Sequence, residues 1–426
     1  MANRILALKK RIIENPLIIR ILTFLMVLGP GLIVMEADND AGAVSAYTQA
    51  GAIYGTKLFW LLLLLLPITY LAQEMVIRLA LSTGKGHAAL IYEKFGKFWG
   101  RYSITNLHIL NFLTLLTEFA ALAMIASALS LPAWAVMIPA VLFLNAIILS
   151  GSYFSWEKIA ILLCVCDASW LAFSYKFGLN GADLKNAVIP ALSYSGSFSN
   201  LIFMIIAIVG TTIAPWQLFF QQSCIVDKKL EAKNLADSRL DTMIGAVFTI
   251  LVAGGMMYAG ALLKAKGIAY SDPAQMARDL GATIGVYWKN LLLLLFANSA
   301  ILGTMAISLA SSWAHAEVME KPGSLNLSFK DGKSFYFVYI LATLAAALVV
   351  SIPHIPLQAI IIGVQIFAGL VLPTSMIFLQ LLLQDKKLIS PEFQNKKWNN
   401  VVNWGIIGLL SILSIVLIIQ MIFFPG

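Results

Sequence analysis

Three acidic residues, Glu36, Asp38 and Asp40, lie in the stretch GPGLIVMEADNDAGAVSAYTQAG, which has apolar sequence on both sides. Carboxylates inside an apolar helix are costly and usually face a cavity or a partner, and their oxygens are the ligands that hard cations prefer. Pro30 at the entry and Gly42 farther on allow helical hydrogen bonding to lapse, which exposes backbone carbonyl groups. The pattern predicts a broken helix that can bind a cation, because three carboxylates at a solvated helix end would not need the apolar flanks.

A second interruption lies in the stretch LIFMIIAIVGTTIAPWQLFFQQS, which carries Gly210, Thr211 and Pro215 near its middle. Proline removes a backbone donor and clashes with the preceding turn, so carbonyl groups near Thr211 become free to meet a ligand. A packing kink alone would give the same pattern. Two interrupted helices in corresponding positions of two five-helix blocks are, however, typical of proteins built from inverted repeats with a binding site at the membrane midplane.

The elements that hold these two breaks are predicted to be membrane-spanning helices. Of 426 residues, 60% are hydrophobic and 12% are charged, about half the charged fraction of a soluble domain. A spanning helix needs roughly 20 apolar residues, and such stretches recur along the chain. We predict an all-α polytopic membrane protein with eleven transmembrane helices. The predicted spans are centred near residues 35, 68, 116, 140, 166, 212, 251, 300, 342, 370 and 413.

The predicted organisation is two inverted five-helix repeats, whose first and sixth helices are broken, followed by one extra C-terminal helix. We assign residues 1–19 to a cytoplasmic N-terminal segment, 20–177 to the first repeat, 196–385 to the second repeat and 398–424 to the eleventh helix. No soluble domain is expected.

The distribution of Lys and Arg predicts the orientation in the membrane. Most of the 29 Lys and Arg residues fall in alternate connecting segments, which are cytoplasmic by the positive-inside rule if the N-terminus is inside. We therefore expect a multi-pass protein of the cell inner membrane, with the N-terminus in the cytoplasm and the C-terminus outside. The excess of Lys and Arg in the cytoplasmic segments then explains the net charge of +8, so no nucleic-acid partner is needed to account for it. The bilayer is the expected surrounding, and a monomer is expected.

Several classes of protein are disfavoured by missing motifs. The three cysteines, Cys164, Cys166 and Cys224, have no CxxC spacing and lie in apolar sequence, which argues against a disulfide framework or a zinc site. No Walker loop, nucleotide fingerprint or HExxH sequence occurs. We expect no enzymatic activity and no cofactor.

Sequence motifs around the first break resemble the NRAMP transporters of divalent transition metals. The resemblance rests on GPG at 29–31, DAGA at 40–43, AGAIYG at 50–55 and STGKGHAALIYEKFG after the second span, and it covers the chain to about residue 385. It implies the fold shared with amino-acid and sodium-coupled transporters, and a divalent metal ion as the substrate.

The resemblance also implies a set of metal-binding positions, several of which carry changed residues. Asp40 matches the metal-binding aspartate of the family, whereas Ala43 replaces its asparagine and Ala214 replaces its metal-binding methionine. One family histidine falls on Trp216 and another on Gln221, and the third-helix pair of acids is reduced to Glu118. The implied site consists of Asp40, Ala43, Thr211, Ala214 and Gln365, with Asp38 as a further ligand.

The loss of the thioether ligand predicts a site for hard cations, because sulfur favours softer ions. The changes resemble the NRAMP-related magnesium transporters, so the expected function is import of Mg²⁺, and also Mn²⁺, as a partly hydrated ion. Without the two histidines, uncoupled uniport is expected, although Glu118 or Glu36 could still carry a proton. Two alternatives stay open: a proton-coupled manganese and iron importer, and a sodium-coupled carrier of a small solute on the same fold.

Two further charged positions need an interpretation. Glu74 and Arg78 are one helical turn apart and are predicted to form a structural ion pair. Asp167 either pairs with a polar group of another helix or lines a vestibule.

Overall fold

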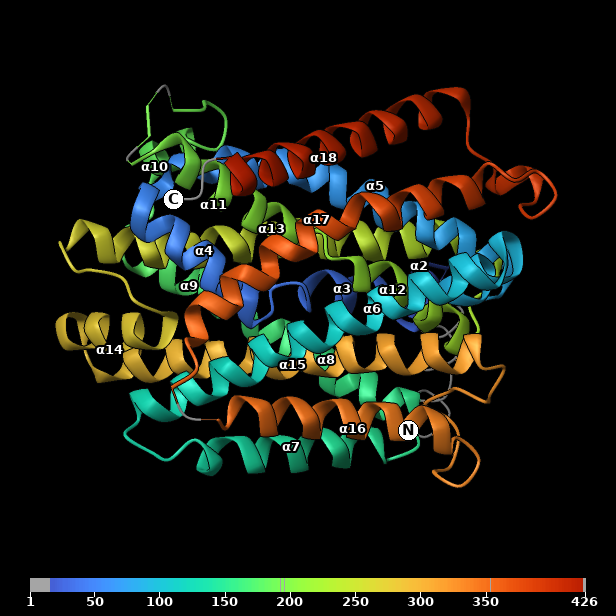
Figure 1. Ribbon diagram of the computed structural model, residues 1–426, viewed down its shortest axis with the longest axis horizontal. Coiled ribbons are helices and arrows are strands. Elements are labelled where there is room, and N and C mark those ends of the chain that lie inside the picture. The colour runs from blue at the N-terminus through green and yellow to red at the C-terminus, as the bar shows by residue number, and fades with distance from the viewer. Residues whose placement is uncertain (1–15, 192, 195, 353, 424–426) are drawn as a thin grey trace, which may run out of the picture.

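Every regular element in the described part of the chain is a helix (Figure 1). The computed structural model describes residues 16–191, 193–194, 196–352 and 354–423. The helices are α2 (Pro16–Val27), α3 (Pro30–Glu36), α4 (Ala41–Tyr54), η1 (Gly55–Leu58), α5 (Phe59–Thr83), α6 (His87–Ala128), α7 (Trp134–Ile148), α8 (Tyr153–Asp167), α9 (Ser169–Lys176), α10 (Gly181–Lys185), α11 (Phe198–Thr212), α12 (Pro215–Asp227), η2 (Ala232–Asn234), α13 (Leu235–Ala265), α14 (Pro273–Ile284), α15 (Val286–Val318), α16 (Lys333–Val350), α17 (Leu357–Leu383), η3 (Pro391–Phe393) and α18 (Lys397–Phe423).

The prediction of an all-helical polytopic membrane protein is confirmed, with a smaller number of clear spans. Nine described helices are long and apolar enough to cross a membrane, and the bent pair α2 and α3 makes ten. Helix α7 has only 15 residues, fewer than the roughly 20 that a straight crossing needs. Helix α4 also continues through η1 into α5 as one apolar stretch, Ala41–Thr83. Length and apolarity alone therefore support nine or ten spans.

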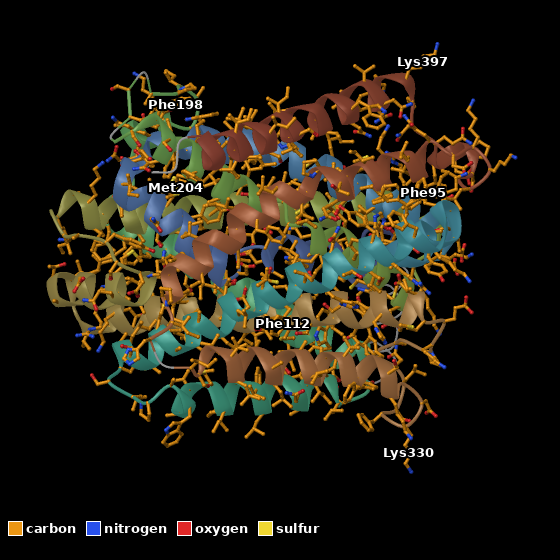
Figure 2. All side chains as sticks on the ribbon, viewed as in Figure 1. Phe95, Phe112, Phe198, Met204, Lys330 and Lys397 are labelled. Atoms are coloured by element: carbon orange, nitrogen blue, oxygen red, sulfur yellow. The ribbon has the colours of Figure 1, made fainter. Side chains whose placement is uncertain are left out.

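The long helices run roughly side by side, and the broken ones lie at the centre. Figure 1 shows α3 and α12 in the middle of the molecule, α18 along one edge and α7 and α16 along the opposite edge. The outer helices expose large apolar side chains, such as Leu142, Leu348 and Val401, which are 65%, 72% and 73% exposed. Figure 2 shows Lys330 and Lys397 pointing away from the edges of the bundle. This is the distribution expected of a protein surrounded by lipid, with charged groups kept to the ends of the spans.

The connecting segments gather at two opposite ends, as the alternation of charge predicts. Residues from 84–93, 223–229 and 313–327 line one cavity, and these are among the segments that are rich in Lys and Arg. Residues from 123–128, 271–278 and 355–359 line another, at the end with few basic residues. Which end faces the cytoplasm stays a prediction, and the proposed N-terminal segment lies outside the described residues except for 16–19.

A sharp bend separates α2 from α3 and sets the direction in which α3 enters the centre. The two helices meet at 49°, and Gly29 between them has φ 143°, which only glycine adopts readily. The carboxylate of Asp241 accepts hydrogen bonds from the N–H groups of Gly29, Gly31 and Leu32 at 3.2, 2.7 and 3.1 Å. Lys228 Nζ donates to the carbonyl of Leu28 at 2.7 Å. The end of α2 and the start of α3 are therefore both capped by side chains from distant helices.

Candidate functional site

The first predicted break lies between Glu36, where α3 ends, and Ala41, where α4 begins. Glu36, Asp38 and Asp40 are buried, with at most 3% of any of them exposed. Asp40 has an extended backbone and caps α4, because its Oδ1 accepts a hydrogen bond from the N–H of Ala43 at 2.8 Å. The acids therefore lie at a true interruption of the helix inside the protein, as predicted.

The second predicted break lies between Thr212, where α11 ends, and Pro215, where α12 begins. Ala214 occupies the capping position of α12 with ψ 140° and has no side chain that could cap it. The hydroxyl of Thr211 is buried and has no hydrogen-bond partner. The break thus leaves a polar side chain and the last carbonyl groups of α11 free for a ligand.

The four half-helices at these breaks carry partial charges of both signs into the centre. The C-terminal ends of α3 and α11 present carbonyl groups, which are equivalent to a partial negative charge and attract a cation. The N-terminal ends of α4 and α12 present N–H groups, which stabilise a carboxylate such as that of Asp40. A cation and its carboxylate ligand can therefore occupy the same small volume without a permanent basic partner.

A second carboxyl group touches Asp40 from helix α6. Glu118 Oε2 accepts a hydrogen bond from the N–H of Ala41 at 3.1 Å, and the carboxyl groups of Glu118 and Asp40 are close enough to interact. Two neighbouring carboxylates repel each other unless a proton or a cation lies between them. Gly303 of α15 makes the approach possible, because a Cβ there would lie 2.8 Å from Asp40 Cβ and 3.1 Å from Glu118 Cδ.

Gln365 of α17 reaches the first break through a gap left by two glycines. A Cβ on Gly42 would lie 1.7 Å from Gln365 Nε2, and a Cβ on Gly210 would lie 2.0 Å from the Gln365 carbonyl oxygen. The side-chain nitrogen of Gln365 is buried and has no partner. Rotation of its amide would place the oxygen at the same position, so that Gln365 can offer a neutral oxygen ligand beside Asp40.

Asp38 lies on the side of the break that faces α5 and α12. It interacts with Gln217 and with Asp40, and its Oδ1 is buried without a partner. Gln217 Oε1 in turn accepts a hydrogen bond from Gln73 at 3.1 Å. Tyr47 closes this side, because its hydroxyl forms a hydrogen bond with Thr212 Oγ at 2.7 Å.

The unpartnered atoms around the two breaks are mainly oxygens from carboxylate, hydroxyl and amide groups. In the described part of the chain, no three His, Cys, Asp or Glu side chains are grouped as a fixed metal centre. Several buried oxygens of the site therefore lack a partner, which suits an ion that is bound weakly enough to leave again. One thioether lies near it: Thr69 Oγ approaches Met35 Sδ at 3.9 Å and donates to the Thr212 carbonyl at 3.3 Å.

Comparison with known proteins identifies the family. The family described as Natural resistance-associated macrophage protein-like, or Nramp, matches residues 31–420. This chain belongs to the Nramp family. Named Nramp relatives include the divalent metal cation transporters MntH of Staphylococcus haemolyticus, 27% identical over 93% of this chain and 92% of the relative, and of Staphylococcus saprophyticus, 28% identical over 92% and 91%.

Solved structures confirm the fold. A manganese transporter of Eremococcus coleocola, in complex with an aromatic bis-isothiourea compound, superposes with a TM-score of 0.74, at 17% identity over 95% of this chain and 89% of that one. A nucleobase-cation-symport-1 family transporter in a closed conformation gives 0.56, at 13% identity over 92% and 91%. The resemblance to the Nramp family is therefore confirmed, and this Nramp protein is a divalent metal transporter rather than an enzyme. These relatives carry the names of divalent metal or manganese transporters, so they do not support assignment to the magnesium branch.

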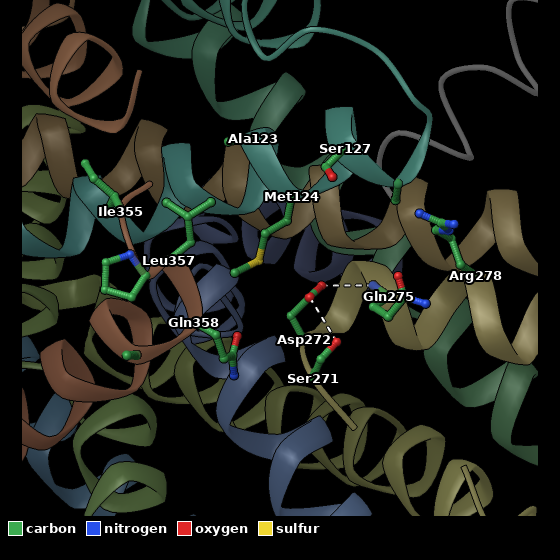
Figure 3. Close-up of a pocket in the computed structure, with 13 residues that line it drawn as sticks. Ala123, Met124, Ser127, Ser271, Asp272, Gln275, Arg278, Ile355, Leu357 and Gln358 are labelled. Atoms are coloured by element: carbon green, nitrogen blue, oxygen red, sulfur yellow. Dashed lines mark hydrogen bonds between the residues drawn. The ribbon is translucent and has the colours of Figure 1, made fainter. Parts of the chain in front are cut away.

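The end with few basic residues holds a cavity of about 420 Å³. Figure 3 shows its lining, which includes Met124 of α6, Asp272 and Gln275 at the start of α14, and Gln358 of α17. Between this cavity and the first break, the hydroxyl of Tyr270 contacts Thr48 Oγ at 3.0 Å. Thr48 lies two turns from Asp40 along α4, so this contact stands between the cavity and the site of this Nramp protein.

An ion-pair network lies at the opposite end. Glu74 Oε2 accepts from Arg78 Nε at 2.9 Å, and Glu74 Oε1 accepts from Arg239 at 2.5 Å. The predicted pair of Glu74 and Arg78 is thus confirmed, with Arg239 of α13 as an additional partner.

Most of the predicted site residues surround the two breaks. Asp38, Asp40 and Thr211 have side-chain oxygens there, and Gln365 contacts both breaks. Ala43 and Ala214 contribute no side-chain ligand; each lines the site at a half-helix terminus. Sequence reasoning missed Gly303, which permits the contact of Asp40 with Glu118, and its only signal was a small residue in an apolar helix.

Proposed function

We propose that this Nramp protein imports a divalent cation through a site made of oxygen ligands, with Mn²⁺ as the principal cargo and Mg²⁺ as a second cargo. The observation that carries the proposal is the group of buried acids at the first break, which has no basic partner in the described residues. Buried charges need a compensating partner. A transported divalent ion supplies it.

The choice between the two ions rests on opposing observations. Oxygen ligands suit both Mg²⁺ and Mn²⁺, and the small side chains of Ala43 and Ala214 leave space for an ion that keeps part of its water. The names of the relatives favour Mn²⁺, as does the thioether of Met35 nearby. The sequence-based preference for Mg²⁺ therefore becomes the weaker half of the proposal.

The ligands that we propose are Asp40 and Asp38, with Thr211, Gln365 and the carbonyl groups at the ends of α3 and α11. Asp40 is the central ligand because it lies at the start of α4 and also touches Glu118. Because Glu118 lies beside Asp40, a metal ion that binds Asp40 disfavours a proton on either carboxyl group. Transport coupled to protons through Glu118 is therefore favoured over the uncoupled uniport that the missing histidines suggested.

The eleven-helix topology is part of the same proposal. The breaks at 37–40 and 213–214 occupy corresponding positions in the blocks 20–177 and 196–385, as in inverted repeats with a site at the midplane. Helix α7 then counts as a short span that local thinning of the bilayer accommodates, and α18 as the extra helix. With the N-terminus inside the cell, a divalent ion gains about 4.6 kcal/mol per 100 mV of membrane potential on entry.

Uptake into proteoliposomes tests the proposal, with Mn²⁺ and Mg²⁺ measured separately and a pH-sensitive dye enclosed. We expect uptake of Mn²⁺ with acidification inside the vesicles. Uptake should fall roughly 100-fold or more in Asp40→Asn, because loss of the charge of a direct ligand costs more than the roughly 10- to 100-fold that outer-shell partners contribute. Glu320→Gln, a change of the same charge at an exposed position, is the control and should transport normally. Uptake that persists in Asp40→Asn would contradict the site, and uptake of Mg²⁺ alone without acidification would restore the uniporter interpretation.

A further inference from the structure

A cavity of about 490 Å³ lies beside the first turn of α18, and its lining shares no residue with the two breaks. Figure 1 shows α18 along one edge of the bundle. Three of the residues around the cavity are basic, Arg78 of α5, Arg239 of α13 and Lys396, and two are acidic, Glu74 and Glu392. The lining therefore carries one net positive charge. We call this space the α18 cavity.

Two guanidinium groups of the lining converge on the single carboxylate of Glu74. Its Oε2 accepts a hydrogen bond from Arg78 Nε at 2.9 Å, and its Oε1 accepts from Arg239 Nε at 3.0 Å and Nη2 at 2.5 Å. Arg78 Nη1 donates to the carbonyl of Phe393 at 2.9 Å and to Asn395 Oδ1 at 2.7 Å. One carboxylate neutralises only one of the two cations, so a surplus positive charge is held in place by α5, α13 and the loop before α18.

Two of the cations have donors without an acceptor. The side chain of Arg78 is 4% exposed, and its Nη2 is buried without a hydrogen-bond partner. Lys396 is exposed and directly follows Asn395, which Arg78 holds. In the part of the chain that the structure describes, the ammonium group of Lys396 forms no ion pair or hydrogen bond. Guanidinium and ammonium groups are strong donors to phosphate oxygens, so the α18 cavity is suited to an oxyanion.

Apolar surface adjoins the charged part of the α18 cavity. Tyr70 and Leu71 line it about two turns before Arg78, toward the middle of α5. Trp398, which is 57% exposed, lines it from α18, and Val401 lies one turn farther along that helix and is also exposed. Charged groups thus lie at the ends of the spans and apolar groups lie deeper, as at the boundary between lipid head groups and acyl chains.

We propose that the α18 cavity binds the phosphate head group of an anionic phospholipid, whose acyl chains lie against the exposed apolar side chains of α18. Basic pockets between membrane-spanning helices bind anionic head groups in this way. The single negative charge of a phosphodiester matches the single net positive charge of the lining. A free phosphate ion would use the basic groups but would leave Trp398 and Val401 without a partner. The proposal does not depend on which metal ion is transported.

The bound lipid is expected to stabilise the folded protein, because the cavity joins α5, α13 and α18. The test is thermal unfolding of the purified full chain in mixed detergent micelles, titrated with dioleoyl phosphatidylglycerol. Dioleoyl phosphatidylcholine, which has no net charge, and inorganic phosphate at the same ionic strength form two parallel titrations. Phosphatidylglycerol at 100 times its dissociation constant should raise the ratio of folded to unfolded protein about 100-fold, and the other two additions should have much smaller effects.

Three variants assign the effect to the cavity. Arg239→Gln removes one cation and leaves the pair of Glu74 and Arg78 in place. It should raise the phosphatidylglycerol concentration that gives half of the stabilisation about fivefold, the contribution of one basic group near anionic lipid. Lys396→Gln should give the same shift, and it folds normally because Lys396 has no partner in the described residues to lose. Lys330→Gln is the matched control, an exposed lysine on the opposite edge of the bundle (Figure 2), and should give no shift.

Four results would overturn the proposal. The first is equal stabilisation by phosphatidylglycerol and phosphatidylcholine, since the charge of the head group would then be irrelevant. The second is inorganic phosphate that reproduces the whole effect, which would make the cavity a site for a free anion. The third is an unchanged titration in Lys396→Gln or in folded Arg239→Gln. The fourth is an equal shift in Lys330→Gln, which would assign the effect to the overall surface charge.

Discussion

The bend between α2 and α3 is predicted to depend on one distant carboxylate, that of Asp241 on α13. Asp241 accepts three backbone hydrogen bonds from the start of α3. The substitution Asp241→Asn keeps the size of the side chain but removes its charge and one acceptor oxygen. At least one N–H of α3 then faces the N–H₂ group of the amide. The start of α3 should therefore open more often.

The expected magnitude follows from these contacts. A hydrogen bond to a charged group contributes about 1.5–3 kcal/mol, and a partly buried anion at a helix N-terminus contributes up to about 2 kcal/mol. Because the amide retains some of the contacts, we expect a loss of about 2–4 kcal/mol. At 1.36 kcal/mol per factor of ten, local opening of this segment should become roughly 30-fold to several hundred-fold more frequent.

Hydrogen exchange of the backbone amides of Gly31 and Leu32 measures this opening directly, because local unfolding exposes those N–H groups. Asp237→Asn is the control, since it lies one turn earlier on the same helix and its carboxylate pairs at 3.0 Å with Arg20, whose side chain is 67% exposed. Exposed pairs contribute about 0–1 kcal/mol, so exchange should rise less than about fivefold. Unchanged protection of Gly31 and Leu32 in Asp241→Asn would refute the reasoning, and so would an equal effect of Asp237→Asn.

The remaining predictions concern close packing and pH. Gly42→Ala places a Cβ 1.7 Å from Gln365 Nε2, so it should displace Gln365, destabilise the protein by about 1–3 kcal/mol and weaken Mn²⁺ binding. Gly254→Ala is the control: a Cβ there meets nothing within 4 Å, so the change should be neutral or slightly stabilising. Equal losses of stability for Gly42→Ala and Gly254→Ala in denaturant unfolding would contradict the prediction. In the loop after α17, the hydrogen bond from Lys94 holds the pKa of Asp385 below its usual value. The stabilisation that this contact gives the folded protein is complete above about pH 3.9, the pKa of Asp in an unfolded chain. It is lost as pH falls through the lower pKa of Asp385 in the folded protein. Lys94→Ala should therefore have a lower free energy of unfolding than wild type at neutral pH, and the two proteins should become equal at a pH below the folded pKa of Asp385. Denaturant unfolding at several pH values measures this, and a difference between the two proteins that grows as pH falls would rule it out.

Local sequence was enough to predict the membrane class and the two breaks. The hydropathy of a segment indicates whether lipid or water surrounds it. Pro215 and the glycines change the hydrogen bonding of the backbone where they stand. Both signals are therefore contained in a short stretch of chain. The acids at 36, 38 and 40 were identified for the same reason, because a charge in an apolar run is unusual wherever the helix lies. Length and apolarity support nine or ten spans rather than the predicted eleven, because α7 has only 15 residues and Ala41–Thr83 is one continuous apolar stretch.

Contacts between distant helices were decided only by the tertiary structure. Asp241 caps a helix that lies more than 200 residues earlier, and Asn298 meets Asp167 across 131 residues. Glu118 touches Asp40 only because Gly303 leaves room for both side chains. No spacing along the chain encodes such meetings, since they depend on how whole helices pack. The sequence by itself therefore determined that acids lie at a broken helix in a membrane. The fold decided that Glu118 lies beside Asp40 and that Asp241 caps the start of α3.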